Sequence, residues 1–212
     1  MSTRGAMVTE IEGDLGRTDL TAYIATKISQ AIKQYHARRF SFNLSRDTTI
    51  ATVVDQHGYT TCAGDFTALA DVIEFENVSI NDSNQIYTLE HVRYPELANY
   101  LRNDDSSGIP TCWTWYAGEF LVYPKPDAVY TINFDAHYKV AEPASDGETG
   151  NKWMTDAYDL IMHSAKRRIY QSRIRNPGLA NADSVAEQEA LLNLHETTVS
   201  IESTDKIKGT RF

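Results

Sequence analysis

The chain has 212 residues, of which 42% are hydrophobic and 23% charged, a composition typical of a soluble globular protein with a substantial core. Its 29 acidic and 20 basic side chains give a net charge of −9, which opposes adhesion to phosphate backbones and argues against a protein that grips nucleic acid. There is no run of about 18 apolar residues and no apolar core of a secretory signal near residue 1, so we expect a protein that spans no membrane and is made in the cytoplasm.

The first periodic segment predicts an amphipathic helix over residues 18–38. Thr18 is an acceptable N-cap, and the apolar residues after it recur three and four positions apart, which places them on one buried side. These apolar residues are Leu20, Tyr23, Ile24, Ile28, Ala31, Ile32 and Tyr35. Lys33, Arg38 and Arg39 collect near the far end, where the helix dipole favours cations.

The middle of the chain predicts strands and turns. Runs rich in β-branched residues alternate with Gly and Asn-Asp-Ser-Asn turn signals, and the last two runs look like a hairpin. The runs are residues 48–54, 59–62, 71–80 and 85–92. A short helix is expected around residues 95–101.

Residues 113–138 are rich in aromatic side chains, which could bind a ligand or fill the core of a sheet. Their spacing decides between these two interpretations. Over residues 130–139 apolar and polar side chains alternate, which is the period of a half-buried strand. Phe120 and Val122 predict the partner strand, and the Pro-Lys-Pro-Asp run at 124–127 turns the chain between the two. Because the strand period accounts for the aromatics without a ligand, we interpret them as sheet core.

Two helices are predicted after a polar linker at residues 142–150. The first runs from Trp153 to about Arg175, where Asn176-Pro177-Gly178 stops it. The second runs over residues 183–203, and the tail after it has no period of either kind. The apolar side of the second helix is expected to hold Val185, Ala190, Leu191, Leu194 and Ile201.

The hydrophobic period thus changes from that of a helix to that of a strand and back, which predicts an α+β fold in a single domain. We expect an antiparallel helical bundle with a β-rich insertion of hairpins and an extended C-terminal tail. The bundle would comprise residues 18–47 and 151–203, the insertion residues 48–141 and the tail residues 204–212.

Candidate catalytic groups are plentiful but lie in no motif. Paired carboxylates could serve acid/base chemistry, yet solvated surface acid accounts for them more simply. The pairs are Glu10 with Glu12, Asp65 with Asp71, and Asp104 with Asp105. The histidines have no metal-ligand spacing, and G-x-S-x-G and glycine-rich phosphate motifs are missing. We therefore expect no catalytic residue, no cofactor and no metal, and we expect the thiols of Cys62 and Cys112 to be buried and free.

One marked basic cluster lies on the helix that begins at Trp153. Its members are Lys166, Arg167, Arg168, Arg173 and Arg175. One interpretation is a solvated face that also satisfies a helix C-terminus. The other is an inter-subunit contact, in which the cluster meets the surface of another copy of this acidic chain.

The order of these signals resembles the head-to-tail adaptor, or connector, proteins of tailed bacteriophages, in particular of short-tailed phages. The resemblance covers roughly residues 15–200 and rests on four stretches whose order is more specific than any one of them. They are "AIKQYHARRFSFN" (31–43), "YTTCAGDF" (59–66), "SGIPTCWTWYAGEFLVYPKPDAVYTINFDAHY" (107–138) and "NKWMTDAYDLIMHSAKRRIYQSR" (151–173). One departure is Cys62-Ala63, where such proteins often carry Leu-Pro before the Asp.

The resemblance implies a structural protein of the virion that forms a ring, commonly of twelve copies, beneath the portal protein at the head–tail junction. The ring would continue the DNA channel toward a downstream tail or nozzle protein. DNA would pass without specific binding, because a negative lumen lacks the counterion release that basic channels gain.

The tail "TDKIKGTRF" has two interpretations. It is a solvated end, or it is a docking peptide that becomes ordered on the portal, with apolar anchors in pockets and cations against acidic surface. The residues of that contact would be Lys206, Ile207, Lys208, Arg211 and Phe212.

Two other classes of function stay open. Some related tail accessory proteins are associated with cell-wall hydrolysis, so a tail-associated peptidoglycan hydrolase is the enzymatic alternative. A carbohydrate-binding module built on the aromatic hairpin is the other.

Overall fold

The structure is a computed structural model, and it describes residues 2–60, 69, 71–83 and 85–205. The fold is mixed α and β, with 46% of the residues helical and 24% in strands. The prediction of a fold with both element types is therefore confirmed.

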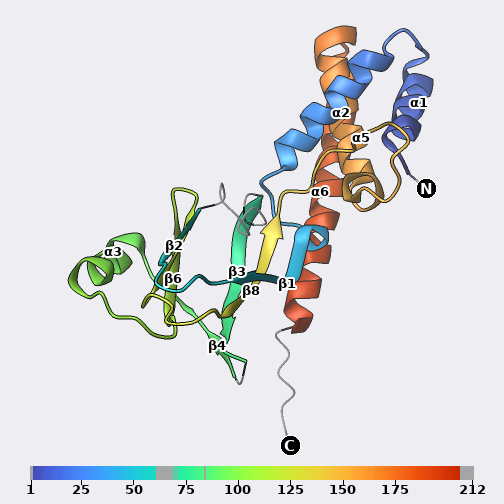
Figure 1. The fold of residues 1–212 in the computed structure, drawn as a ribbon. Coiled ribbons are helices and arrows are strands. Elements are labelled where there is room, and N and C mark those ends of the chain that lie inside the picture. Colours follow the sequence, from blue (N-terminus) through green and yellow to red (C-terminus); the bar gives the residue numbers. More distant parts are fainter. Residues whose placement is uncertain (1, 61–68, 70, 84, 206–212) are drawn as a thin grey trace, which may run out of the picture. The chain divides into compact units, whose positions relative to one another are not determined.

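The chain divides into two compact units, which we call the helical unit and the β unit (Figure 1). The helical unit is formed by Met1–Asn43 with Lys139–Phe212, and the β unit by Leu44–Tyr138. The described helices of the helical unit are α1 (Arg4–Leu15), α2 (Thr21–Tyr35), the 3-10 turn η1 (Ser41–Asn43), α4 (Lys152–Thr155), α5 (Tyr158–Ile169), the π-helical turn η3 (Tyr170–Ile174) and α6 (Pro177–Asp205).

The sequence pattern does not predict the N-terminal helix α1. The Thr3 hydroxyl accepts a hydrogen bond from the Ala6 N–H at 3.1 Å, and Gly16, with φ of 60°, ends the helix. Only Met7, Val8 and Ile11 of this helix are buried. A stripe of three apolar residues within 12 is too short to give a clear helical period.

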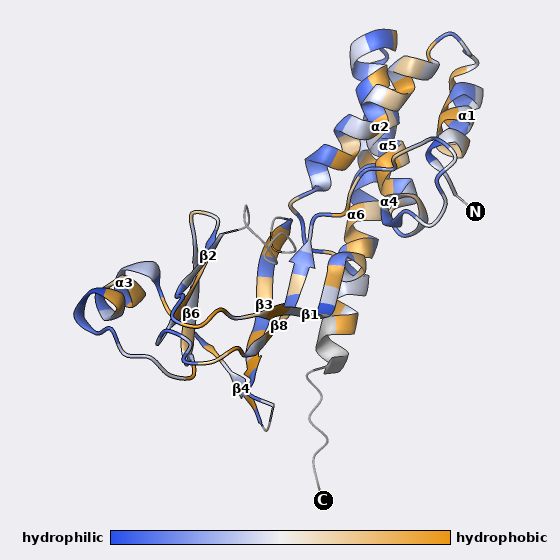
Figure 2. Ribbon diagram, viewed as in Figure 1, coloured by the Kyte–Doolittle hydropathy of each residue, from blue (hydrophilic) through white to orange (hydrophobic). Residues whose placement is uncertain are grey.

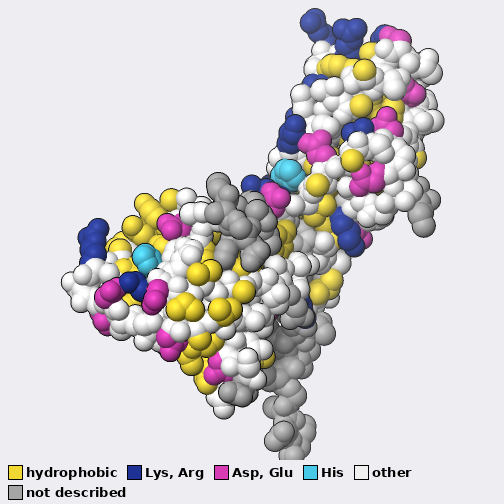
Figure 3. Space-filling model, viewed as in Figure 1, with side chains coloured by type: hydrophobic (Ala, Val, Ile, Leu, Met, Phe, Trp, Pro, Cys, Tyr) yellow, Lys and Arg dark blue, Asp and Glu magenta, His cyan; other side chains and the backbone are white. Residues whose placement is uncertain are grey.

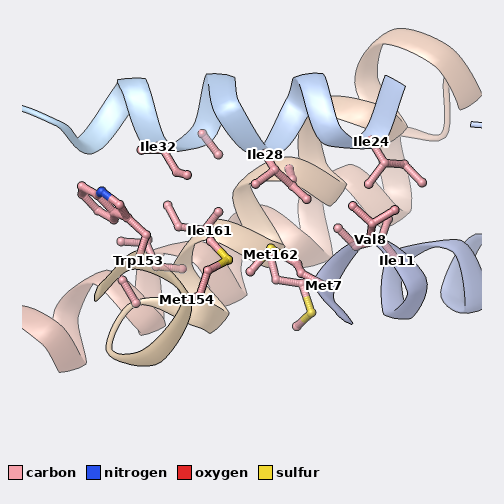
Figure 4. Packing of buried hydrophobic residues seen from close by; sticks show 14 of the residues in the cluster. Met7, Val8, Ile11, Ile24, Ile28, Ile32, Trp153, Met154, Ile161 and Met162 are labelled. Atoms are coloured by element: carbon pink, nitrogen blue, oxygen red, sulfur yellow. The ribbon is translucent and has the colours of Figure 1, made fainter. Parts of the chain in front are cut away.

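Helix α2 confirms the amphipathic helix expected over residues 18–38. Ile24, Ile28 and Ile32 lie on its inner side and are fully buried. Figure 4 shows these side chains directed toward Met7, Ile11 and the residues of α4 and α5.

The helix expected from Trp153 to Arg175 is present as α4, α5 and η3. The Asn151 side chain caps α4 by accepting from the Trp153 N–H at 3.1 Å. Trp153 is fully buried, and its indole Nε1 donates to the Val140 carbonyl at 3.0 Å. Arg175, with φ of 57°, ends the segment in the left-handed conformation.

Helix α6 begins earlier than the sequence predicts, at Pro177 instead of residue 183. The Asn-Pro-Gly stretch that stops one helix also starts the next, because proline is favoured in the first turn of a helix. The Asn176 side chain caps this start by accepting from the Leu179 N–H at 3.2 Å. Helix α5 packs against both α2 and α6.

The expected apolar side of α6 is only partly correct. Ala190, Leu191 and Leu194 pack against the core of the helical unit. Val185 and Ile201 are instead 56% and 47% exposed. The inner side of α6 is largely polar, as its buried members are Ala180, Asp183, Glu187 and Thr198.

The described residues of the β unit form two four-stranded sheets and the α-helix α3 (Tyr94–Asn103). The first sheet has the order β1 (Leu44–Ala51), β8 (Thr131–Tyr138), β3 (Val72–Asn81), β4 (Ile86–Thr88). The second has the order β2 (Gly58–Thr60), β7 (Glu119–Tyr123), β6 (Cys112–Tyr116), β5 (Glu90–His91). The β3–β4 hairpin and the short helix are therefore present. The run expected at residues 85–92 is divided between β4 in the first sheet and β5 in the second, and residues 61–62 of the run expected at 59–62 lie outside the described residues.

The two sheets share one hydrophobic core, and the aromatics of residues 113–138 supply much of it. The Phe120 and Phe134 rings meet edge to face at 5.1 Å, and both side chains are fully buried. Ile132 and Ala136 are also fully buried, so the alternation along β8 is confirmed. His137 departs from it, since the ring is buried and its Nε2 lies 3.1 Å from Glu76 Oε1.

The expected partner strand of β8 is wrong. Phe120 and Val122 lie in β7, which pairs with β6 and β2, whereas β8 pairs with β1 and β3. Pro124 and Pro126 lack the N–H groups that a continuing ladder requires, and the chain passes there from one sheet to the other.

Candidate interaction surfaces

The basic cluster predicted from the sequence lies at the end of α5 and in the turn after it. Lys166, Arg167 and Arg168 form the last turn of α5, whereas Arg173 lies in η3 and Arg175 follows it. Figure 3 shows Lys and Arg side chains at the end of the helical unit where α5 passes into α6.

Three of these cations are held by groups of their own chain. Lys166 Nζ lies 2.8 Å from Asp14 Oδ2 of α1. Arg167 forms an ion pair with Glu187 of α6, and Arg168 donates to the Gln34 side chain of α2. Arg173 and Arg175 are exposed to solvent and form no ion pair within 4 Å among the described residues. The structure thus brings the first three cations into the helical unit and leaves the last two on its surface.

The carboxylate of Glu187 joins three helices. It accepts a hydrogen bond from the Tyr35 hydroxyl of α2 at 2.5 Å and is paired with Arg167 of α5. Burial acts to raise the pKa of Glu187, but the hydrogen bonds from Arg167 and Tyr35 outweigh it and hold the pKa below its ordinary value. Burial and the bond to Glu187 raise the pKa of Tyr35. The carboxylate is therefore charged and serves as a structural anchor.

A second polar cluster lies beside this anchor. His163 Nδ1 lies 2.9 Å from Asp183 Oδ1, and Lys166 Nζ lies 3.9 Å from the same oxygen. Lys166 of α5 also contacts Asp14 of α1, so this lysine links α5 to both α1 and α6. No group of three or more His, Cys, Asp or Glu side chains in the described residues is placed to hold a metal ion.

The carboxylate pairs considered for acid/base chemistry bind groups of their own chain. Glu10 accepts from the Tyr158 hydroxyl at 2.6 Å, and Glu12 accepts from Thr21. Asp104 accepts from the Tyr123 hydroxyl at 2.6 Å, and Asp105 pairs with Lys125. Asp71 precedes β3, and its expected companion Asp65 lies outside the described residues.

A cleft with a volume of about 560 Å³ lies in the β unit. Phe75, Trp113 and Trp115 form an aromatic wall, with ring centroids 5.1 and 5.6 Å from Phe75 to the two indoles. Trp113 is only 7% exposed, so its main role is in the core.

Cys112 is buried and free, as expected, while Cys62 lies outside the described residues.

An exposed apolar surface that the sequence pattern does not predict lies on α6. Val185, Leu192 and Val199 are 56%, 59% and 48% exposed and follow one another at seven-residue intervals. Figure 2 shows hydrophobic residues recurring along this helix. The seven-residue interval can be found in the sequence. It does not predict a second apolar side as long as a single buried side is expected for α6.

The tail residues expected to dock on the portal, Lys206, Ile207, Lys208, Arg211 and Phe212, lie outside the described residues. No described helix is both long enough and apolar enough to cross a membrane.

Comparison with known proteins gives one family. No curated protein matches the chain. The family model described as SU10 adaptor protein matches residues 2–204, which is nearly the whole chain. The chain therefore belongs to the SU10 adaptor protein family, a family of bacteriophage structural adaptors, as the sequence resemblance implies.

Proposed function

We propose that this protein is a head-to-tail adaptor whose copies form a ring that docks on the portal protein and extends the DNA channel to the tail. The match of the adaptor family model to residues 2–204 is the observation that carries this proposal. Membership in the family implies a virion component that interacts with other phage head and tail proteins. The ring, its portal and nozzle contacts and the number of twelve copies come from the resemblance.

The proposal assigns different tasks to the two units. The helical unit would serve as an antiparallel bundle that carries the β unit as its insertion. A fold with a continuous core of α1, α2, α4 and α5 supports this role, because a ring subunit needs a rigid body on which contacts are built.

The charge of the chain supports passage of DNA without specific binding. A net charge of −9 repels a phosphate backbone and provides none of the counterion release that holds DNA on basic proteins. We propose that DNA slides past the ring and makes no stable contact with it.

Two sets of residues are proposed for assembly. The tail residues Lys206, Ile207, Lys208, Arg211 and Phe212 would dock on the portal. In the inter-subunit contact, Arg173 and Arg175 are the cluster members with exposed side chains, so they are the ones available to a neighbouring copy.

Imaging of intact particles tests this function. A map of the head–tail junction should contain a ring of this fold directly below the portal. A map in which that position is occupied by a different protein would contradict the proposal.

The enzymatic alternative has no observation in its favour, and a cell-wall clearing assay with the purified chain is expected to give no clearing.

A further inference from the structure

We infer that the outer face of α6 packs against the outer face of α2 of a second copy of this chain. This inference rests on the proposed function, because it names the contact that would join neighbouring copies in the ring. Two exposed stripes, their charges and their placement within one copy carry the argument.

The first surface is the α6 outer stripe, which consists of exposed residues spaced alternately three and four positions apart. Its members are Ala182, Val185, Glu189, Leu192, Glu196 and Val199. This spacing places all six on one side of the helix, and it is the spacing with which one helix packs against another.

The α6 outer stripe is not needed to hold α6 on its own unit. The opposite side of the helix does this, through buried Asp183, Glu187 and Thr198 and through Leu191 and Leu194. Large apolar side chains repeated along the free side of a helix mark a site of interaction, because an isolated chain gains nothing from exposing them.

The second surface is the α2 outer stripe, which consists of Ala22, Thr26, Gln30 and Lys33. All four are exposed, and they lie on the side of α2 opposite Ile24, Ile28 and Ile32. Ala22 and Thr26 are small, so a second helix can approach this side closely.

The two surfaces carry opposite charge. The α2 outer stripe contains one cation, Lys33, and no acid, whereas residues 177–201 contain four acids and neither lysine nor arginine. Glu189 and Glu196 are the exposed acids among them. The Lys33 side chain is 68% exposed and lies 3.5 Å from Glu142, a contact that a better placed carboxylate can replace. Opposite charge on two faces of one chain sets both the orientation and the partner of a contact.

The two stripes of one copy do not meet, because each is exposed on the surface of its own helical unit. The contact therefore has to form between copies, with α6 of one copy on α2 of the next. A contact between two different faces is heterologous, and its repetition closes into a ring when the rotation permits. This makes a second copy the partner that fits both the charges and the proposed ring.

Charge reversal tests the contact with full-length chains added to purified portal rings. One variant reverses the α6 acids, with Glu189→Lys and Glu196→Lys. The other reverses the cation of the α2 outer stripe, with Lys33→Glu. We expect each variant alone to give at least a tenfold lower yield of complete rings by mass photometry. We expect a 1:1 mixture of the two to restore assembly, because each reversed face then meets its complement.

An apolar substitution pair provides the matched control. Leu192→Asp should block ring completion, whereas Val129→Asp, at a position 67% exposed in the β unit, should leave it unchanged. Circular dichroism melting should show that all variants fold as the unaltered chain does.

The outcomes separate this inference from the proposed function. If the unaltered chain and Leu192→Asp both complete rings, the inference is overturned and the proposed function stands. If Leu192→Asp completes rings but fails to retain the downstream tail protein, the stripe belongs to that protein and the inference is again overturned. If the unaltered chain adds no copies to portal rings, both the proposed function and the inference that rests on it are overturned.

Discussion

Arg167 of α5 and Glu187 of α6 form an ion pair with only 21% and 7% of their side chains exposed. The Tyr35 hydroxyl of α2 donates to the same carboxylate at 2.5 Å. A buried carboxylate is costly unless a cation and hydrogen bonds compensate it, and here both are present. One charged group therefore links three helices that also share a hydrophobic core.

We predict that Arg167→Met strongly destabilises the helical unit. Removing one partner of a buried ion pair leaves the other charge uncompensated, which costs about 3–5 kcal/mol. Arg173→Met is the control, because its side chain is exposed and its loss should change the free energy of unfolding by less than about 0.5 kcal/mol. Urea denaturation followed by circular dichroism measures both, and equal midpoints for the two variants would contradict the prediction.

We predict that ionisation of Glu187 contributes to the pH dependence of the free energy of unfolding. Its pKa in the folded state is lowered, so its contribution is fully present above the pKa of the unfolded chain and is lost as the pH falls through the folded value. We expect the unaltered chain to lose stability below about pH 4.3, the ordinary glutamate pKa. Glu187→Gln should show a smaller loss in that range. Identical acid unfolding profiles for the two chains would rule out this role.

Trp153 should be the most sensitive apolar position of the helical unit. Trp153→Ala removes a fully buried side chain and is expected to cost about 3–5 kcal/mol. Trp153→Phe keeps an aromatic ring but loses the hydrogen bond from Nε1 to the Val140 carbonyl, so it should cost less than the alanine variant. Thermal unfolding of the two variants gives the order, and an alanine variant as stable as the phenylalanine variant would refute it.

Deletion of residues 204–212 should separate folding from attachment. The core residues that the structure describes in the helical unit lie between Met7 and Leu194, so we expect the truncated chain to melt at the same temperature as the full chain. Binding to portal rings should be lost, because the proposed anchors Ile207 and Phe212 and the nearby cations are removed together. A truncated chain that binds portal with unchanged affinity would show that the tail is a solvated end.

Local periodicity makes part of this fold predictable. Helix α2 follows from isoleucines spaced four residues apart, and β8 follows from strict alternation over residues 130–139. These signals survive because each element has one buried side and one exposed side. The core position of Phe134 follows from the same rule.

Non-local pairing explains what the sequence does not reveal. The Ala117-Gly118 turn favours a hairpin of β6 and β7, but no local signal indicates that β2 is the other neighbour of β7, because strand partners are chosen by the whole sheet. The apolar side of helix α6 is predicted incorrectly because apolar residues also lie on its exposed side. Its buried side contains Asp183 and Glu187 in place of apolar residues. Their partners His163 and Arg167 lie 20 residues earlier on α5, and only the folded chain brings them together.

The mass of portal rings before and after addition of the purified full-length chain tests the central claim most directly. The purified chain alone should be a monomer at low concentration, because each contact between copies is weak until a template raises the local concentration. With portal present, we predict a discrete mass increase that corresponds to one complete ring of copies. Portal rings whose mass stays unchanged at saturating chain concentration would contradict the assignment as an adaptor.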